Sequence, residues 1–183
     1  MKIMFASDIH GSLPACKAIL ARFEQENADR LFLLGDLLYH GPRNPLPEGY
    51  NPMEMSETLN VLPVKPICVR GNCDSEVDQM VLDFPITADY TILPLQNNHI
   101  AFITHGHLFN IHHMPPISSG DLLIHGHTHI HTAEPHNGIT YINPGSASLP
   151  QKGQPKSYMI LHWEQNLFEI KSFDGAVLLS HQA

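Results

Sequence analysis

Five apolar runs in this chain, each of strand length, end in a cluster that contains aspartate, asparagine or histidine. The clusters are Asp8-Ile9-His10, Gly35-Asp36, Gly71-Asn72-Cys73-Asp74, His105-Gly106-His107 and Gly126-His127-Thr128-His129. In open α/β sheets, ligands gather beyond the strand ends, so clusters that are far apart in the sequence can meet at one point. The repetition therefore predicts an α/β fold with a single site assembled from five loops.

The pattern of expected elements changes along the chain. Strands are expected over 2–6, 31–34, 67–69, 91–95, 99–104, 122–125, 139–142, 158–162 and 167–172, and helices over 14–23 and 53–60. The segment 41–52 contains four prolines and two glycines and is predicted to be an irregular loop near the mouth of the site. Alternating strand and helix followed by a strand-rich half indicates a layered α/β fold with mixed sheets.

Length and composition limit the classes of function. The 183 residues, 43% of them hydrophobic, suit one globular domain over 1–183. Charged residues make up only 15%, and the formal net charge is −8. Because lysine and arginine are scattered, the surface offers no electrostatic footprint for a nucleic-acid backbone. Small anionic substrates remain compatible with this composition.

The cysteines and the apolar runs bear on the compartment. Cys16, Cys68 and Cys73 are an odd number without close metal-type spacing, which favours a reducing compartment over a disulfide scaffold. The apolar run near the N-terminus is too short for a signal peptide, and no later run approaches the length of a membrane span. We therefore expect a soluble, cytoplasmic protein without a membrane partner.

The clusters supply a mixed set of metal ligands. Its members are Asp8, His10, Asp36, Asn72, His105, His127 and His129. Imidazole nitrogen combined with carboxylate or amide oxygen suits Mn, Fe, Co, Ni or Zn and needs no thiolate. Seven groups exceed the needs of one ion, but they serve two ions when one carboxylate bridges and solvent completes each shell. The set thus favours a binuclear centre.

The order of these motifs resembles that of the calcineurin-like metallophosphoesterases. That family carries D-x-H, G-D, G-N-x-[DE], H and G-H-x-H in this order, and the match runs from Asp8 to His129. The stretches FASDIHGSLPA, HGPRNPLPEGY, GNCDSEVDQM and NPGS are similar to small bacterial phosphodiesterases of the family and extend the likeness through Ser146. The resemblance implies a four-layer αββα sandwich with two facing mixed β-sheets.

The resemblance also implies a role for each ligand. Asp8, His10 and His129 hold a first ion, Asn72, His105 and His127 hold a second, and Asp36 bridges them. The implied activity is hydrolysis of small phosphodiesters by attack of a bridging metal-bound hydroxide, with two divalent ions per chain and Mn²⁺ as the first choice. Two divalent ions, two aspartates and one hydroxide leave a charge of +1, which attracts an anionic diester.

Each of these residues taken singly has a structural explanation. An aspartate caps helices, an asparagine forms turns, and most histidines are surface or satisfied core residues. Seven coincidences in the order of the family are a poorer explanation than one site. The remaining histidines of the His-rich stretches have no motif to support them and are predicted to be surface residues: His112, His113, His125, His131 and His136.

Cys73 departs from the family pattern, because many relatives carry a histidine acid after the asparagine. A thiol with a reference pKa of ~8.5 is a poorer proton donor than imidazole, so good leaving groups or another acid are needed. His107 and His40 are the candidate acids, each with a structural role as the alternative, and Cys73 itself could be inert packing. The candidate catalytic residues are therefore Asn72, Cys73, His107 and His40.

The loops suggest further contacts. Arg43 and His40, in or beside the proline-rich loop, are candidate substrate contacts, with solvated or structural roles as alternatives. Asp74 is expected to support its loop. The stretch 143–146 is predicted first as a turn, with a secondary role in supporting the site.

Two other classes of function share the expected fold. One is a scaffold for protein contacts, as in a retromer subunit that has lost ligands, whereas this chain keeps all seven. The other is a phosphomonoesterase or a DNA-repair nuclease, and a nuclease needs a basic surface for duplex DNA, which is absent here. A small phosphodiester is thus the favoured substrate. A homo-oligomer, dimer or tetramer, stays open, as do the native metal and the general acid.

Overall fold

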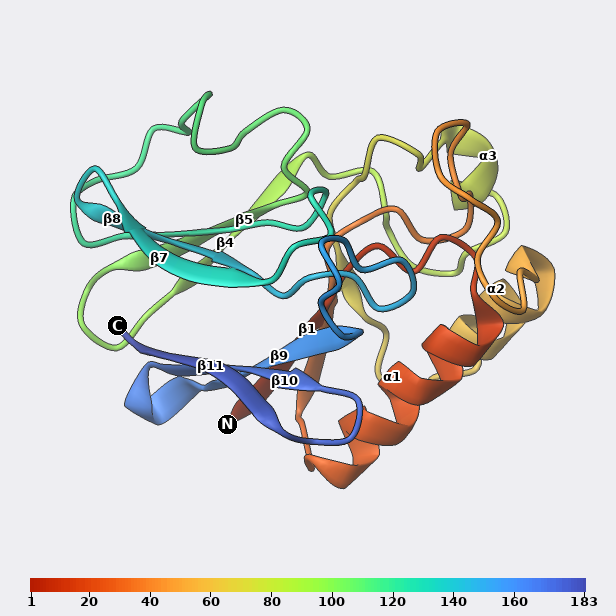
Figure 1. Cartoon of the computed structure of the whole chain (residues 1–183), viewed down its shortest axis with the longest axis horizontal. Helices are drawn as coiled ribbons and strands as arrows, with labels where there is room; N and C mark the ends of the chain where they lie inside the picture. The colour runs from red at the N-terminus through yellow and green to blue at the C-terminus, as the bar shows by residue number, and fades with distance from the viewer.

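Two mixed β-sheets lie face to face in the computed structural model, which describes residues 1–183 (Figure 1). The first sheet has the strand order β11-β10-β9-β1-β2-β3. Its strands are β1 (Lys2–Ala6), β2 (Arg30–Leu33), β3 (Ile67–Cys68), β9 (Ser157–His162), β10 (Leu167–Ser172) and β11 (Val177–Gln182). Strands β1, β2 and β3 are parallel, and β9, β10 and β11 pair antiparallel.

The second sheet has the strand order β4-β5-β6-β8-β7. Its strands are β4 (Tyr90–Pro94), β5 (Ile100–Thr104), β6 (Leu122–Ile124), β7 (Thr132–His136) and β8 (Ile139–Asn143). The three inner strands are parallel, whereas β4 and β7 pair antiparallel at the two edges. The expected fold class, with two facing mixed sheets, is confirmed.

Helices α1 (Leu13–Gln25) and α2 (Pro52–Asn60) cover the outer face of the first sheet. The four-residue α3 (Glu76–Gln79) follows β3, and the 3₁₀ turn η1 (Trp163–Gln165) connects β9 and β10. The side chain of Ser12 accepts a hydrogen bond from the Ala15 N–H, and Asn51 caps α2 in the same way. Such caps each contribute about 1 kcal/mol to a helix. Both helices therefore start where the sequence supplies a cap and a proline in the first turn.

Two cores share strand β1. Met4 and Ala6 pack against the helices, whereas Ile3 and Phe5 pack between the two sheets. Successive side chains of a strand point to opposite faces, so a strand covered on both sides is apolar at every position. This explains why β1 is apolar at each of its four buried positions, 3–6.

The outer face of the second sheet is covered by the irregular segment 105–121. Phe109, Ile111 and Met114 of this segment pack against Phe102 and Leu123 of the sheet. The fourth layer is therefore present, but it is built without a helix. Two adjacent prolines, at 115 and 116, interrupt this segment. A proline inside a helix removes a backbone hydrogen bond and clashes with the preceding turn.

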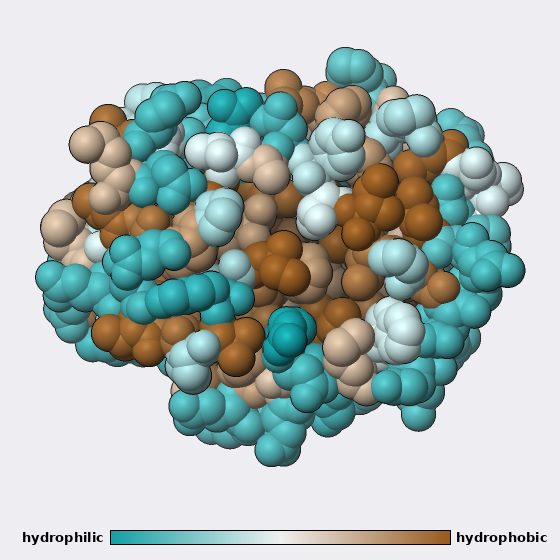
Figure 2. Space-filling view, turned by 180° about the vertical axis from the view of Figure 1, so that it is seen from behind, coloured by the Kyte–Doolittle hydropathy of each residue, from teal (hydrophilic) through white to brown (hydrophobic).

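Four elements were not expected from the sequence: β7, β11, α3 and η1. Strands β7 and β11 each lie at the edge of a sheet. Seen from behind, the rim of the molecule is largely hydrophilic, and apolar residues gather toward the middle of the face (Figure 2). None of the helices has both the length and the apolar composition that crossing a membrane requires.

Candidate metal centre and substrate pocket

The predicted ligands share an unusual backbone conformation. Five of the seven have positive φ in the left-handed region: Asp8 (56°), His10 (53°), Asp36 (53°), His127 (67°) and His129 (59°). The other non-glycine residues with positive φ are four asparagines and Lys152. A strained residue of this kind costs about 1–3 kcal/mol, and such strain gathers at functional sites. The concentration of strain therefore marks these loops independently of their sequence motifs.

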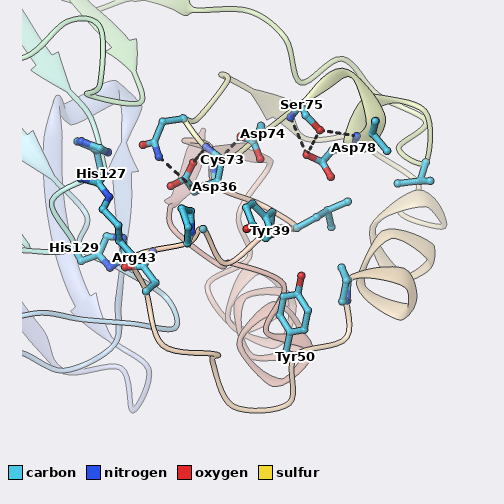
Figure 3. Close-up of a pocket in the computed structure, with 18 of the residues that line it drawn as sticks. Asp36, Tyr39, Arg43, Tyr50, Cys73, Asp74, Ser75, Asp78, His127 and His129 are labelled. Atoms are coloured by element: carbon cyan, nitrogen blue, oxygen red, sulfur yellow. Dashed lines mark hydrogen bonds between the residues drawn. The ribbon is translucent and has the colours of Figure 1, made fainter.

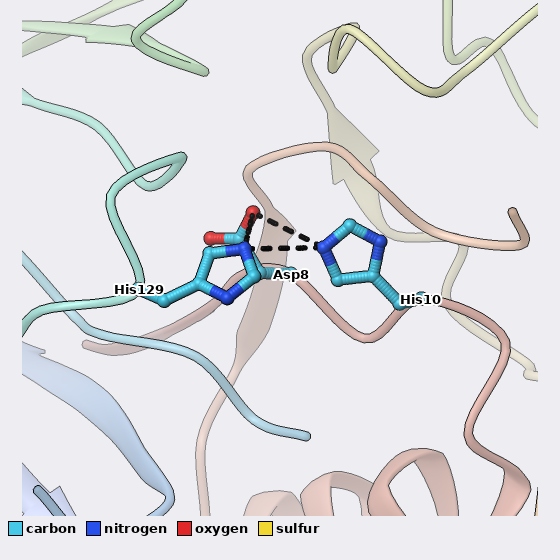
Figure 4. A group of neighbouring side chains, drawn as sticks. All are labelled: Asp8, His10 and His129. Carbon is cyan, nitrogen blue, oxygen red and sulfur yellow. Dashed lines mark hydrogen bonds and ion pairs between the residues drawn. The ribbon is translucent and has the colours of Figure 1, made fainter. Parts of the chain in front are cut away.

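The first ligand group consists of Asp8, His10 and His129. The Nδ1–H of His10 donates to the carbonyl oxygen of Tyr39 at 2.9 Å, and the Nδ1–H of His129 donates to that of Leu149 at 2.7 Å. In the neutral imidazole, each Nε2 then carries a lone pair and no proton. The two Nε2 atoms lie 3.2 Å apart and face each other, with the Asp8 carboxylate beside them (Figure 4).

This arrangement fits a metal ion. Asp8 Oδ1 lies 3.4 Å from His129 Nε2 and 3.9 Å from His10 Nε2, and it has no hydrogen-bond partner although it is buried. An unpartnered buried carboxylate oxygen facing two nitrogen lone pairs is costly unless a cation joins them. Neighbouring ligands of one ion with bonds of ~2.1 Å lie about 3 Å apart, which matches the spacing here.

The second ligand group consists of Asp36, Asn72, His105 and His127. The Nδ1–H of His105 donates to the Leu34 carbonyl oxygen at 2.6 Å, which leaves its Nε2 free to bind. This Nε2 lies 3.1 Å from Asn72 Oδ1 and 3.5 Å from Asp36 Oδ2. The His127 ring centroid is 5.1 Å from that of His105. The ligand atoms of Asp36, Asn72 and His105 thus lie close together, and the His127 ring lies beside that of His105.

Asp36 lies between the two groups. Its Oδ2 is 3.5 Å from His105 Nε2 and 3.6 Å from His10 Nε2. Burial opposes ionisation, but the hydrogen bond and charge of His105 hold the pKa of Asp36 well below its usual range. For His105, burial disfavours the charged imidazolium and lowers the pKa, but the nearby carboxylates of Asp36 and Asp8 outweigh it and raise the pKa to about 9. The two carboxylates therefore create a negative potential that favours a positive charge at this point.

Asp74 holds the loops that follow β2 and β3. Its carboxylate accepts from the N–H groups of Asp36 at 2.8 Å, Leu37 at 2.8 Å and Gly71 at 2.7 Å. Burial raises the pKa of Asp74 to about 6, although these N–H bonds oppose the change. The expected support of the loop is confirmed, and it extends to the backbone of the bridging residue.

Two serines and an asparagine fix the loops of the first group. Ser146 and Ser148 donate their hydroxyl protons to the Asp8 carbonyl oxygen at 2.8 and 2.9 Å. The Asn143 side-chain amide donates to the Gly126 carbonyl oxygen at 2.8 Å. The secondary role expected for the turn at 143–146 is confirmed. Ser148 was missed by the sequence analysis because a serine in a loop carries no distinctive signal.

Two of the motif positions must be glycine because neighbouring atoms leave no room for a side chain. A Cβ atom on Gly71 would lie 2.1 Å from Asp36 Oδ1, and one on Gly126 would lie 1.9 Å from Ser7 Oγ. No real side chain tolerates such contacts, so these glycines allow the ligand loops to pack against each other. The glycines in G-N-x-D and G-H-x-H are therefore as important to the geometry as the ligands beside them.

A pocket of about 960 Å³ opens beside both ligand groups. Its lining includes Asp36, Asn72, His127 and His129, and apolar side chains with Tyr39 and Tyr50 line much of the rest (Figure 3). Arg43 lines the same pocket, toward the side of His127 and His129 in this view, and takes part in none of the ion pairs of the chain. A guanidinium group without an ion-pair partner is therefore available in the pocket that contains these predicted ligands.

The pocket contains one of the three candidate acids. Cys73 lines it, and its Sγ accepts from the Asn72 side-chain amide at 3.2 Å. Burial, and then the charge of Asp36, raise the pKa of the Cys73 thiol to about 12. His40 and His107 do not line this pocket. His40 stacks on Tyr39 at 4.9 Å, and the His107 ring lies 5.4 Å from that of His105.

One expectation about the remaining histidines is wrong. His125 is buried, with 2% of its surface exposed, and its ring stacks on Tyr141 at 4.6 Å. Its position directly after β6, before the chain turns into the G-H-x-H loop, places it inside the protein. His112 and His113 are exposed, as expected, while His131 and His136 are half-buried.

Known proteins resemble this chain in sequence and structure. A family model described as a calcineurin-like phosphoesterase superfamily domain matches residues 1–166. Phosphodiesterase YfcE of Escherichia coli (strain K12) is 53% identical over 161 residues, which cover 88% of this chain and 87% of that protein. The solved structure of YfcE, described as a phosphoesterase, matches with a TM-score of 0.94 and 48% identity over 100% of this chain and 99% of that one. Vps29 of Entamoeba histolytica, solved with Zn²⁺, shares the fold, with a TM-score of 0.61 and 19% identity over 100% of this chain and 98% of that one.

Proposed function

The chain belongs to the calcineurin-like phosphoesterase superfamily, and from that premise we propose that it is a metal-dependent phosphodiesterase acting on small phosphodiesters. The observation that carries the proposal is the convergence of Asp8 Oδ1 with the Nε2 atoms of His10 and His129 in a buried site. The name of the YfcE relative supports the choice of a diester as substrate.

Two divalent ions per chain are part of the proposal. The first ligand group would hold one ion and Asn72, His105 and His127 the other, and the position of Asp36 Oδ2 between the groups supports a bridging role. When bound, such ions lower the pKa of a water nucleophile and polarise the phosphoryl oxygens. Mn²⁺ is our first choice, with Zn, Fe, Co and Ni as alternatives that the same ligand types accept.

The chain's own residues bind and orient the substrate. The Arg43 guanidinium, which has no partner, is free to bind a non-bridging phosphate oxygen and can do so through two hydrogen bonds. Asn72 lies at the pocket end where the phosphate would bind and is exposed. Burial raises the pKa of the Cys73 thiol, and a thiol is a poorer proton donor than an imidazole. The leaving group should therefore be acidic.

We further propose that residues 1–183 act as one domain, because Phe5 and Ile103 from opposite sheets belong to one core. A reducing, cytoplasmic location is proposed from the three cysteines, all of which are unpaired. Neither a nucleic-acid duplex nor a membrane is proposed as a partner.

Elemental analysis and a paired rate measurement test the function. We expect about two transition ions per chain, hydrolysis of bis(4-nitrophenyl) phosphate, slower hydrolysis of 4-nitrophenyl phosphate, and loss of both activities on chelation. Faster hydrolysis of the monoester would favour a phosphomonoesterase. Absence of metal, together with no activity after adding Mn, Co, Ni or Zn, would favour a scaffold. Salt-dependent affinity for duplex DNA would instead indicate a nuclease.

A further inference from the structure

The pocket beside the ligand groups is much larger than a phosphate group needs. It has a volume of about 960 Å³, and the predicted metal ligands occupy only one end of it. We propose, on the basis of the proposed function, that the substrate is a phosphodiester with one flat, uncharged apolar arm, which binds against Tyr39, Tyr50, Met53 and Val77.

Three of these four side chains are large, apolar and exposed. Tyr39 is 42% exposed, Met53 58% and Val77 69%. Single exposed apolar residues are common on any protein surface and need no explanation. Here they come from three separate elements, namely the loop after β2, helix α2 and helix α3, and they line the same pocket. A ligand that covers them together gains from the removal of apolar surface from water.

His40 fixes the two tyrosines of the pocket relative to each other. Its ring stacks on Tyr39 with a centroid distance of 4.9 Å and packs against Tyr50 at 5.3 Å. Its Nδ1–H donates to the Gly41 carbonyl oxygen, which sets the orientation of the ring. The aromatic walls are thus formed before a ligand binds, and preformed aromatic faces favour a flat ligand. This gives His40 a positioning role outside the pocket lining.

The charges of the pocket exclude an anionic arm. Asp36, Asp74 and Asp78 line it, and Arg43 is the only lysine or arginine that does. Arg43 lies at the metal-ligand end, whereas Asp78 lies at the far end with Ser75 (Figure 3). The Asp78 carboxylate is held there by the Ser75 N–H and hydroxyl, at 2.8 and 2.9 Å. A second negative charge on the arm would meet a carboxylate without a nearby cation.

The same pocket contains both the apolar walls and four predicted metal ligands. Because the two regions are continuous, a phosphate bound at the ligands places one of its ester arms along the walls. This continuity favours a substrate arm over an unrelated small molecule or a protein segment as the occupant.

Fluorescent diesters test the proposal directly. Methyl 2-naphthyl phosphate, methyl 6-carboxy-2-naphthyl phosphate and dimethyl phosphate are titrated against the metal-loaded protein, with the naphthyl fluorescence as the signal and dimethyl phosphate as a competitor. We expect the naphthyl diester to bind at least about tenfold more tightly than the other two, since an apolar aromatic group contributes about 1.5–3 kcal/mol when buried. Because the metal-loaded protein is expected to hydrolyse an aryl diester, the signal is read in a stopped-flow mixer before turnover, and the released naphthol is quantified separately.

Matched variants locate the binding site. Met53→Ser and Val77→Ser are each expected to weaken naphthyl binding about three- to tenfold, because each removes a few apolar carbons. Met80→Ser and Val61→Ser are the controls, because these residues are 83% and 80% exposed and do not line the pocket. All four positions are on the surface, so loss of folding is not expected to confuse the comparison.

The outcomes separate this inference from the proposed function. Naphthyl binding that is lost in the pocket variants and kept in the controls supports the inference, whether or not any diester is hydrolysed. Equal binding of the naphthyl and dimethyl diesters, equal binding of the carboxylated diester, or equal effects of Met53→Ser and Met80→Ser would overturn it. Hydrolysis of bis(4-nitrophenyl) phosphate with any of those results would leave the phosphodiesterase assignment standing alone.

Discussion

The two ligand groups differ most in how far solvent reaches them. Asp8 and His10 are 0% exposed and His129 is 6% exposed, whereas Asn72 is exposed and His127 is half-buried. The histidines of the first group are anchored through Nδ1 to a backbone carbonyl oxygen, and so is the buried His105 of the second group. Asn72 contacts only Cys73 and His105 through its side chain, and the His127 ring has no such anchor. For the two proposed ions, the open side formed by Asn72 and His127 predicts that the second ion exchanges more readily than the first.

The largest effect is expected from the residue that belongs to both groups. Asp36→Asn removes the negative charge between the ions, so we expect both ions to be lost or weakened and kcat/KM to fall by at least about 10³. Metal content and diester hydrolysis are measured on the same sample. If Asp36→Asn keeps its metal while His127→Gln loses both ions, then Asp36 does not bridge.

Replacing one histidine in each group tests the contrast itself. His10→Gln is expected to lose the buried ion and about 10² to 10³ in kcat/KM, without rescue by excess metal. His127→Gln is expected to lose the second ion only, and millimolar metal should restore much of the activity because solvent can replace the missing ligand. Activity is followed as a function of added metal. Equal rescue of the two variants would mean that burial does not distinguish the ions.

Cys73 lies on the open side of the centre, where a proton donor would be most useful. Cys73→His introduces a group with a reference pKa of ~6.5, so we expect alkyl diesters to gain about tenfold or more while aryl diesters change little. Rates are measured across leaving groups of different pKa for the wild type, Cys73→His and Cys73→Ala. Identical slopes for the wild type and Cys73→His, with unchanged metal content, would show that Cys73 does not occupy the position of the acid.

The smallest effect is expected from a serine that supports the first ligand group without being a ligand. Ser148→Ala removes one of the two hydroxyl groups that donate to the Asp8 carbonyl oxygen, while Ser146 still donates. We expect a loss of about 1 kcal/mol in the free energy of unfolding in urea and a modest decrease in affinity for the first ion only. Ser180→Ala, which alters an exposed serine on β11 outside the ligand loops, is the comparison. A change confined to the second ion would contradict the assigned connection.

The sequence predicts the inner strands and their polar ends well, because a strand buried on both faces must be apolar and the site loops must follow it. Strand β7 has the sequence TAEPH, with a proline and no alternating apolar pattern, so only pairing at the sheet edge reveals it. Strand β11 is likewise an edge strand and largely exposed. Edge strands carry weak signals because one side of their backbone is unpaired and few of their side chains are buried.

The candidate site likewise has a part that the sequence predicts and a part that it does not. The seven proposed ligands could be named from the sequence because each stands in a short polar motif that directly follows an apolar run. The walls of the pocket could not, because Tyr39, Tyr50, Met53 and Val77 come from a proline-rich loop and two short helices without a common period. Such side chains meet only through tertiary structure.

Left-handed backbone at five predicted ligands also bears on how related proteins evolve. The five are Asp8, His10, Asp36, His127 and His129. Glycine adopts this conformation with less strain than any residue with a Cβ atom, so replacement would relieve the backbone strain at these positions once hydrolysis ceased to be selected. Lineages that keep the fold but abandon the reaction should accumulate glycine at these five positions before their cores change. The residues found there then record whether selection for the chemistry persists.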